Sequence, residues 1–306
     1  QEYKMANSAK AWISAARPRT LPLSISGILT GSAIAVLEDA FNWTIFGLAI
    51  ATTLSFQILS NFANDYGDGV KGTDNEDRLG PERAIQSGAL TDKTLKKGMI
   101  INAIISLIFA FLLIGYAFDF ENLVGISIYF GLAILSIVAA IKYTVGDNAY
   151  GYSGFGDLFV FLFFGLVSVI GVFYLYDQTF SFIHFLPASA IGMLSVAVLN
   201  LNNMRDRKSD LSSKKMTLAI QLGEKGAKLY HSSLIMISLV LLLIFYNTYA
   251  VEVYLYSAFI VYVPLLIHLI EVIKNKHPKA LDPELKKVAL SCFGFSLIFF
   301  VYSFWT

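Results

Sequence analysis

The stretch AFNWTIFGLAIATTLSFQILSNFANDYGD, residues 40–68, decides how this chain folds. Residues 40–64 carry no charge, and a bilayer-spanning helix needs about 17 to 25 mostly apolar residues. Two aspartates, Asp65 and Asp68, follow directly. The stretch therefore predicts a transmembrane helix that carries carboxylates where it reaches the membrane surface.

Charge-free runs of this kind recur along the whole chain, and only 15% of the 306 residues are charged. The nine runs are 20–37, 40–64, 98–118, 122–141, 158–176, 178–204, 229–251, 253–270 and 288–306. They predict an all-α membrane protein with nine transmembrane helices, built as a single domain over residues 1–306 in which 1–16 form an N-terminal tail. The lipid bilayer is then its main partner.

Basic residues identify the side on which each connection lies. All 23 Lys and Arg residues fall on one side of a nine-span chain. The connections on the other side carry only acidic charges: Glu38, Asp39, Asp119, Glu121, Asp177 and Glu252. Lys and Arg near span ends stay cytoplasmic, which predicts a multi-pass protein of the cytoplasmic (inner) membrane with its N-terminus inside and its C-terminus outside.

Two other features exclude classes of function. The formal net charge is +1, whereas phosphate-backbone binding requires a clustered basic excess, so no nucleic-acid partner is expected. The single cysteine, Cys292, lies in the last apolar run without a partner, which excludes a disulfide framework and a thiolate metal site.

Two acidic motifs carry most of the candidate chemistry. The first, residues 61–78, reads NFANDYGDGVKGTDNEDR, and the second, residues 200–210, reads NLNNMRDRKSD. If each helix continues through its motif, the oxygen ligands converge on one helical face. The expected metal ligands are Asn64, Asp68, Asp74, Asn203, Asp206 and Asp210.

Oxygen ligands without neighbouring His or Cys favour Mg²⁺ over Zn²⁺. Mg²⁺ takes one or two carboxylates together with substrate phosphates, so two facing motifs suit a diphosphate bridged by metal ions. The basic residues expected to cover the remaining phosphate charge are Lys71, Arg78, Arg83, Lys142 and Arg205. A polar turn accounts for residues 72–80 equally well, because Asn, Asp and Gly prefer loops. A calcium hand does not fit, since the closing Glu is missing.

Four stretches resemble the UbiA superfamily of intramembrane prenyltransferases. They are AARPRTLP (15–22), QILSN through GALT (57–91), KYT with YGYSGFGD (142–157) and NNMRD through TLAIQLG (202–223). Within the superfamily, the chain is most similar to the MenA branch, which prenylates 1,4-dihydroxy-2-naphthoate in menaquinone synthesis. The spacing from Asp68 to Asp74 is longer than in the hydroxybenzoate branch and supports this placement.

The resemblance implies nine helices around a central cavity, closed by a cytoplasmic cap made of the two motifs and their loops. It implies metal and diphosphate roles for Asn64, Asp68, Asp74, Asp206 and Asp210, with Asp65 close by. The partners implied are a polyprenyl diphosphate and 1,4-dihydroxy-2-naphthoate, which would lose CO₂ and give demethylmenaquinol. A different aromatic acceptor, 4-hydroxybenzoate or homogentisate, is the alternative.

The remaining candidates follow from the chemistry of the reaction. Asp65 or Asp157 would accept a proton, and Lys142 or Arg17 would hold the carboxylate of the acceptor. Tyr143, together with Tyr150 and Tyr152, would stabilise an allylic cation through its ring face.

The sequence is also compatible with a different class of membrane protein. A secondary transporter also has intramembrane carboxylates, but usually near the bilayer midplane, whereas these lie at one face. His268 and Glu271 are one helical turn apart near the inner end of a span, and we expect them to form an interfacial pair and not a catalytic one. We expect His184, His231 and His277 at interfaces or in loops.

Overall fold

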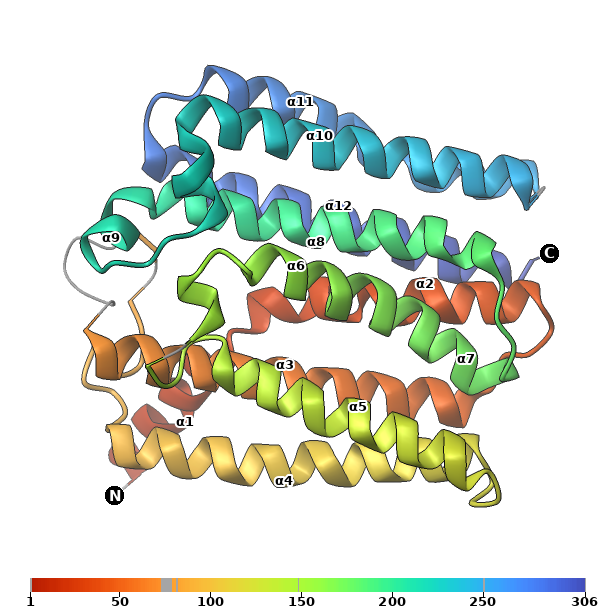
Figure 1. Cartoon of the computed structure of the whole chain (residues 1–306), viewed down its shortest axis with the longest axis horizontal. Coiled ribbons are helices and arrows are strands. Elements are labelled where there is room, and N and C mark those ends of the chain that lie inside the picture. The colour runs from red at the N-terminus through yellow and green to blue at the C-terminus, as the bar shows by residue number, and fades with distance from the viewer. Residues whose placement is uncertain (1, 73–78, 81, 148, 250, 306) are drawn as a thin grey trace.

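The computed structural model describes residues 2–72, 79–80, 82–147, 149–249 and 251–305, and its described part is built from helices (Figure 1). In chain order the elements are α1 (Glu2–Ala16), η1 (Pro18–Thr20), α2 (Leu21–Leu37), α3 (Trp43–Lys71), α4 (Asp92–Ala117), α5 (Leu123–Lys142), η2 (Tyr150–Tyr152), α6 (Gly156–Val160), η3 (Phe161–Gly171), α7 (Val172–Asp177), η4 (Phe182–His184), α8 (Phe185–Arg205), α9 (Arg207–Ser212), α10 (Leu218–Thr248), η5 (Val253–Val261), α11 (Tyr262–Lys274), η6 (Pro278–Leu281) and α12 (Asp282–Ser303).

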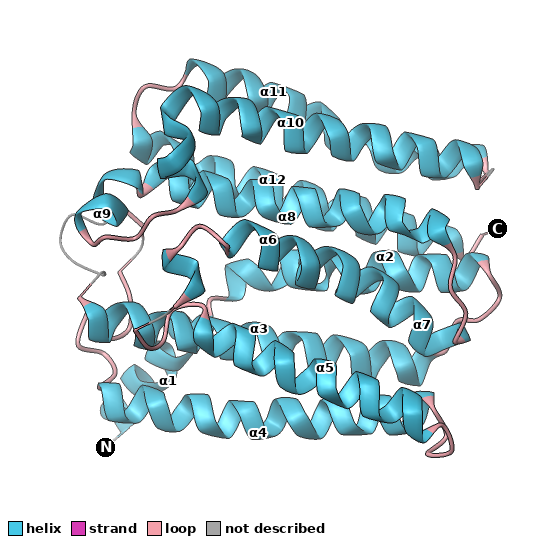
Figure 2. Ribbon diagram, in the orientation of Figure 1, coloured by secondary structure: helices cyan, strands magenta, loops and turns pink. Residues whose placement is uncertain are grey.

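Nine helical segments within the described residues are long and apolar enough to cross a membrane, which confirms the predicted number. They lie side by side as an elongated bundle, and loops join them at its two ends (Figure 2). The helices extend beyond several predicted runs, because polar turns continue the helix outside the apolar core. Thus α3 continues to Lys71, seven residues past the end of the charge-free run.

Small residues allow the central helices to approach closely. A Cβ on Gly27 of α2 would lie 2.9 Å from the Phe164 carbonyl oxygen of η3, and a Cβ on Gly165 would lie 2.6 Å from the Ala188 carbonyl oxygen of α8. The segment η3 is a π-helix, a wider winding that is frequent at functional sites. Backbone contacts of this kind fix α2, η3 and α8 as one packed layer.

The outer face of the bundle is apolar. On α5, the side chains of Ile128, Leu135 and Val138 are exposed, and only two of its residues are buried. In water such a surface would be unfavourable, whereas lipid tails cover it at no cost. The protein is therefore a multi-pass membrane protein.

Three of the four histidines are buried. The expectation of an interfacial or loop position is wrong for His231 and His268, whereas His184 does lie in the connection between α7 and α8. His231 and His268 are both fully buried, and their Nε2 atoms lie 2.7 Å apart. His268 Nδ1 pairs with Glu284 Oε2 at 2.5 Å and not with Glu271. His184 pairs with Glu38 at 2.9 Å, and His277 is exposed as expected. Each buried ring has at least one polar partner that is distant in the sequence, while His184 Nδ1 and His231 Nδ1 have none among the described residues.

The ends of the bundle provide a topology test. The two termini lie at opposite ends, and the carboxylate motifs lie at the end that holds the N-terminus (Figure 1). In a Cys292→Ser background, cysteines at the exposed positions Lys93 and Lys276 should react with an impermeant maleimide only from the cytoplasmic side. A cysteine at the exposed Glu121 should react only from outside. Labelling of Glu121 and Lys276 positions from one side would contradict the orientation.

Candidate active site

Residues 61–71 of the first motif form roughly the last three turns of α3, and residues 73–78 lie outside the described part of the chain. Asn64 and Asp68 are one turn apart on the same helical face, as the sequence predicts. The helix ends at Gly72, whose φ of 70° is the left-handed conformation that glycine adopts readily. Asp65 and Asp68 are both buried. The C-terminal end of α3 therefore delivers two carboxylates to one end of the bundle.

Asp65 is held between two arginines. Its Oδ1 accepts hydrogen bonds from Arg17 and from Arg83 Nη1, the latter at 2.7 Å. Nearby, Asn61 Nδ2 donates to the Ala16 carbonyl oxygen at 2.8 Å, which ties the turn before α2 to α3. Two cationic partners stabilise the charged form of a buried carboxylate. Asp65 is thus placed as an anchor for Arg17 and Arg83.

Asp68 lies at the centre of a second group of contacts. Tyr152 donates its hydroxyl to Asp68 Oδ1 at 2.8 Å, and Arg83 Nη2 lies 3.6 Å from Asp68 Oδ2. The ammonium of Lys71 lies 4.1 Å from the centroid of the Tyr152 ring, a cation–π distance. Asp68 therefore lies among three positively charged or donor groups that come from three separate segments.

The second motif differs from its expected helical form. The helix α8 ends at Arg205, Asp206 leaves the helical conformation (φ −92°, ψ 8°), and α9 starts anew. Arg205 and Asp206 form a two-pronged pair, Nε to Oδ1 at 2.8 Å and Nη2 to Oδ2 at 2.7 Å. Neighbouring residues on a regular helix do not face each other, so this pairing requires the break. The expectation that Asn203, Asp206 and Asp210 share one continuous helical face is wrong.

Arg205 also reaches outside its motif. Its Nη1 donates to Asp282 Oδ1 at 2.5 Å, at the start of α12, and its Nη2 donates to Asn202 Oδ1 at 2.8 Å. A guanidinium with several carboxylate and amide partners is held in one orientation. The side chain is 1% exposed, so it organises the second motif from inside.

Asp210 lies opposite the first motif, and Lys215 lies between them. Lys215 Nζ is 3.5 Å from Asp210 Oδ1. Burial raises the pKa of Asp210 to about 6, with Asp206 and Asp68 adding to the shift and Lys215 opposing it. Burial works to lower the pKa of Lys215, but Asp68 and Asp210 outweigh it and raise that pKa. The two motifs therefore share one electrostatic site.

A close backbone contact brings a further loop to this site. A Cβ on Gly67 would lie 2.7 Å from the carbonyl carbon of Thr144, and Thr144 donates its hydroxyl to the Ala63 carbonyl oxygen at 2.9 Å. Only a glycine permits this approach, which places Tyr143 beside the first motif.

Gly67→Ala should therefore displace the loop, cost about 1–3 kcal/mol of stability and lower turnover roughly 10²-fold. Thermal unfolding and a prenyl-transfer assay would measure both effects. Gly47→Ala on the same helix, where a Cβ meets nothing within 4 Å, is the matched control and should leave both unchanged. Equal behaviour of the two variants would show that the contact is dispensable.

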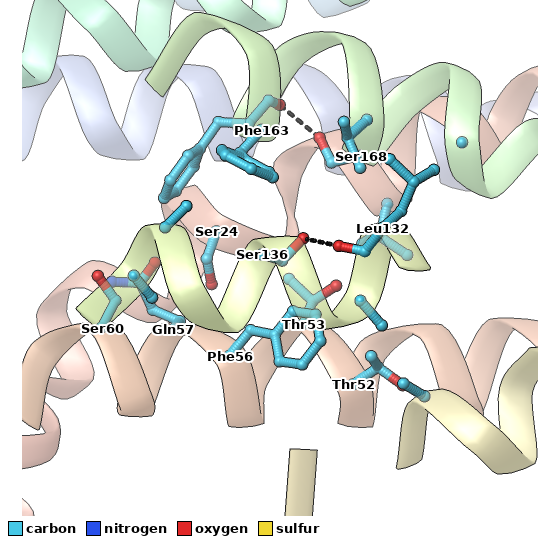
Figure 3. A pocket seen from close by; sticks show the side chains of 18 of the residues that line it. Ser24, Thr52, Thr53, Phe56, Gln57, Ser60, Leu132, Ser136, Phe163 and Ser168 are labelled. Carbon is cyan, nitrogen blue, oxygen red and sulfur yellow. Dashed lines mark hydrogen bonds between the residues drawn. The ribbon is translucent and has the colours of Figure 1, made fainter. Parts of the chain in front are cut away.

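An apolar cavity of ≈ 390 Å³ extends from this end of the bundle between α3, α5 and η3. Asn64, Tyr143 and Tyr150 line it at the motif end, and Ile28 and Leu175 line it at the other. Its wall carries scattered hydroxyl and amide groups, among them Gln57, Ser60, Thr53, Ser136 and Ser168 (Figure 3). Ser136 donates to the Leu132 carbonyl oxygen of its own helix at 2.7 Å, so this hydroxyl is already satisfied. The cavity suits a long apolar chain with a polar head.

Aromatic rings close the motif end of the cavity. Tyr150 stacks on Phe159 with ring centroids 4.0 Å apart, and Tyr143 meets Tyr150 edge to face at 5.4 Å. Burial raises the pKa of Tyr143 to about 12, which keeps its hydroxyl protonated. Ring faces here can stabilise a cation. Tyr143 and Tyr150 thus line the cavity at this end, and the cation-stabilising role of Tyr143 stays a prediction.

Other candidates lie further from the cavity. Asp157 is buried at the start of α6 and faces Tyr230, and its Oδ1 has no hydrogen-bond partner among the described residues. Lys142 is exposed at the end of α5 and is not among the lining residues of the cavity. Asp74 and Arg78 lie outside the described residues.

Sequence reasoning missed Lys215 and Asp282 as site residues. Lys215 stands in a short run of polar residues after α9, and its burial comes from tertiary contacts. Asp282 is 76 positions beyond Asp206, so only the fold brings them to one arginine. The sequence signal that could have identified Lys215 is its place inside the fourth family-like stretch, residues 202–223.

The residues of the two motifs fit a hard divalent cation. Asp210 Oδ2 is buried and has no hydrogen-bond partner in the described part of the chain. The donors are carboxylate and amide oxygens, which Mg²⁺ prefers. Among the described residues, no three carboxylate, imidazole or thiol groups lie close enough to hold an ion alone. A Mg²⁺ ion here would need further oxygens, such as those of a diphosphate.

Comparison with known proteins shows to which family this chain is similar. Residues 24–290 match the UbiA prenyltransferase family. The 1,4-dihydroxy-2-naphthoate octaprenyltransferase of Haemophilus influenzae is 42% identical over 97% of this chain and 96% of its own length. The enzyme of the same name from Escherichia coli is 40% identical over 95% and 94%.

A solved structure has the same fold at lower identity. The apo structure of a UbiA homolog from Aeropyrum pernix superposes with a TM-score of 0.65 at 15% identity, over 89% of this chain and 96% of that one. The family match, the identity along nearly the whole length and the shared fold agree. This chain belongs to the UbiA prenyltransferase family.

Proposed function

We propose that this protein transfers a polyprenyl chain from its diphosphate to 1,4-dihydroxy-2-naphthoate, with Mg²⁺, in menaquinone synthesis. The observation that carries the proposal is the position of Asn64, which belongs to the first carboxylate motif and lines the end of the apolar cavity. Such a site holds a diphosphate at the motifs and an apolar tail among the helices. The relatives from Haemophilus influenzae and Escherichia coli bear the name of this reaction.

Residues of both motifs would hold the metal and the leaving group. Asn64, Asp68 and Asp210 are the proposed ligands, with Asn203, Asp206 and, from outside the described residues, Asp74. A Mg²⁺ ion held by these residues would supply positive charge to offset the charge that develops on the departing diphosphate. Arg83 and Lys71 lie beside Asp68, where they can hold phosphate oxygens. The motifs thereby favour breakage of the allylic C–O bond.

The cavity governs what happens to the allylic carbon. Its apolar lining excludes water, which would otherwise capture the cation. Tyr143 and Tyr150 offer ring faces at the motif end, where the carbon would be released. The electron-rich naphthoate ring then attacks through the carbon that carries the carboxylate. When CO₂ leaves, the electrons of its bond to the ring restore the aromatic system. No base is therefore needed to remove a proton from that carbon.

Gln57 and Ser60 are the polar lining residues nearest to Asn64 in sequence, and they lie together at one end of the cavity (Figure 3). They offer hydrogen-bonding groups to the two hydroxyl groups of the acceptor. Arg17, which is bound to Asp65, is the proposed partner of the acceptor carboxylate. We further propose that the single domain lies in the cytoplasmic membrane with this end open to the cytoplasm.

The test is a reaction with purified protein, Mg²⁺, a polyprenyl diphosphate and 1,4-dihydroxy-2-naphthoate. Demethylmenaquinol and CO₂ should form in equal amounts, and EDTA should abolish both. Parallel reactions with 4-hydroxybenzoate and homogentisate should give little product. Ready prenylation of either of these, with the naphthoate untouched, would overturn the acceptor assignment.

A further inference from the structure

Lys215 is a buried cation at the junction of the two motifs. Its side chain is 11% exposed, and its Nζ lies 3.5 Å from Asp210 Oδ1. The same ammonium interacts with the charge of Asp68 and lies 5.6 Å from the centroid of the Tyr152 ring. Tyr152 in turn donates its hydroxyl to Asp68. Lys215 thus connects the first motif to the second.

The backbone around Lys215 is fixed on both sides. Its N–H donates to the Asp210 carbonyl oxygen at 2.8 Å, and the next residue, Met216, donates its N–H to the Tyr152 carbonyl oxygen at 2.9 Å. The preceding residue, Lys214, has a φ of 57°, a conformation that non-glycine residues rarely adopt. A strained turn pinned at both ends is maintained by its surroundings. The position of the ammonium is therefore built into the fold.

The carboxylates need such a cation when no metal is bound. Two buried carboxylates that share a site repel each other, and a positive charge between them offsets the repulsion. A divalent ion bound by the same oxygens would meet the ammonium as a like charge. Lys215 and the metal ion therefore compete for one position between Asp68 and Asp210.

We infer that Lys215 is an internal counter-ion that occupies the metal position in the metal-free protein and moves onto the diphosphate when metal and substrate bind. This inference rests on the proposed use of Mg²⁺ by the two motifs. It makes metal binding and diphosphate binding mutually supportive, because the displaced ammonium gains a new anionic partner only when diphosphate is present. Metal alone then binds weakly, and premature assembly of the site is avoided.

The first experiment measures Mn²⁺ binding to the full-length protein in detergent, by calorimetry and electron paramagnetic resonance. Without pyrophosphate, Lys215→Met should bind Mn²⁺ about 10-fold more tightly than wild type. Inorganic pyrophosphate should tighten Mn²⁺ binding in both proteins, because it supplies further oxygen ligands, but by a clearly smaller factor in Lys215→Met, which has no ammonium to move onto it.

Two control variants separate this role from general electrostatics. Lys208→Met removes an exposed positive charge on α9 near the same motif and should behave as wild type. Lys215→Arg keeps the charge and should also stay close to wild type. Wild-type Mn²⁺ affinity and wild-type coupling to pyrophosphate in Lys215→Met would overturn the inference.

Thermal unfolding with and without Mn²⁺ tests the inference even if Lys215→Met is less stable than wild type. Removal of Lys215 leaves the two carboxylates without their cation, so Lys215→Met should be less stable than wild type in EDTA and gain more from Mn²⁺. A gain equal to that of Lys208→Met would contradict the competition.

A measurement on the wild-type protein requires no substitution. Amine-reactive labelling followed by mass spectrometry should show Lys215 protected in EDTA and more reactive once Mn²⁺ is added, with the exposed Lys208 and Lys214 as internal references. Unchanged reactivity of Lys215 on addition of Mn²⁺ would overturn the inference. None of these experiments uses the prenyl donor or the aromatic acceptor, so a failure of the proposed prenyl transfer would appear separately, in the assay of wild-type protein.

Discussion

Asp68→Asn and Asp210→Asn are each expected to lower prenyl-transfer turnover roughly 10²- to 10³-fold, because each removes a carboxylate charge where the departing diphosphate needs a bound cation. Asparagine keeps the shape of the side chain, so the effect reports the charge. Single-turnover measurements at saturating Mg²⁺ would determine it. Glu82→Gln is the control, since Glu82 is exposed beside Arg83 at the same end of the bundle. Turnover within a few-fold of wild type in both aspartate variants would refute the assigned site.

Asp206→Asn should differ from these two in its effect on stability. Asp206 is held by both prongs of the buried Arg205, so the substitution weakens two charge-assisted hydrogen bonds. We expect a loss of about 1–3 kcal/mol in the free energy of unfolding along with the loss of turnover. Chemical denaturation would compare the free energies of unfolding of the three variants. We expect a loss for Asp206→Asn and little change for Asp68→Asn and Asp210→Asn.

Ser136→Phe is the second substitution with a large expected effect. Ser136 lines the cavity seven residues before Tyr143 on α5, roughly 10 Å from the motif end along the helix axis. Its hydroxyl bonds to its own helix, so no partner is left unsatisfied by the change. A phenyl ring here should block a long tail and leave room for a short one. Turnover with a long polyprenyl diphosphate should fall about 10²-fold.

The comparison of donors of different length makes this test specific. Dimethylallyl and geranyl diphosphate should retain turnover within a few-fold of wild type. Leu135→Phe, on the neighbouring residue that is 60% exposed on the outer face, should leave all donors unaffected. An equal loss with short and long donors would mean that the ring disturbs the cap and that the tail lies elsewhere.

The number of helices and the first motif could be predicted because they depend on local properties. Nine charge-free runs of sufficient length are a signal within each segment, and all nine are helices. Asn64 and Asp68 lie on one helical face because α3 continues past the apolar run, as their spacing indicates.

The second motif and its partners could not be predicted in the same way. The break at Asp206 depends on the pairing of Arg205 with Asp206 and Asp282, and the latter contact spans 77 positions. The burial of His231 and His268 likewise depends on α10, α11 and α12 packing together. The π-helical winding of η3 gives no periodic signal in an apolar run of this kind. These features arise from contacts between helices.

The charged groups that pair with one another at the two motifs are balanced in number among the described residues. Five carboxylates, Asp65, Asp68, Asp206, Asp210 and Asp282, contact or neighbour five cations, Arg17, Lys71, Arg83, Arg205 and Lys215. This set carries no net charge, so the long-range field at the cytoplasmic end comes from the remaining charges, and on that side the 23 Lys and Arg residues outnumber the acidic residues. Capture of the anionic donor should then be faster at low ionic strength. The encounter is governed by lateral diffusion of the lipid tail within the bilayer, and the density of the donor per unit of membrane area sets the rate.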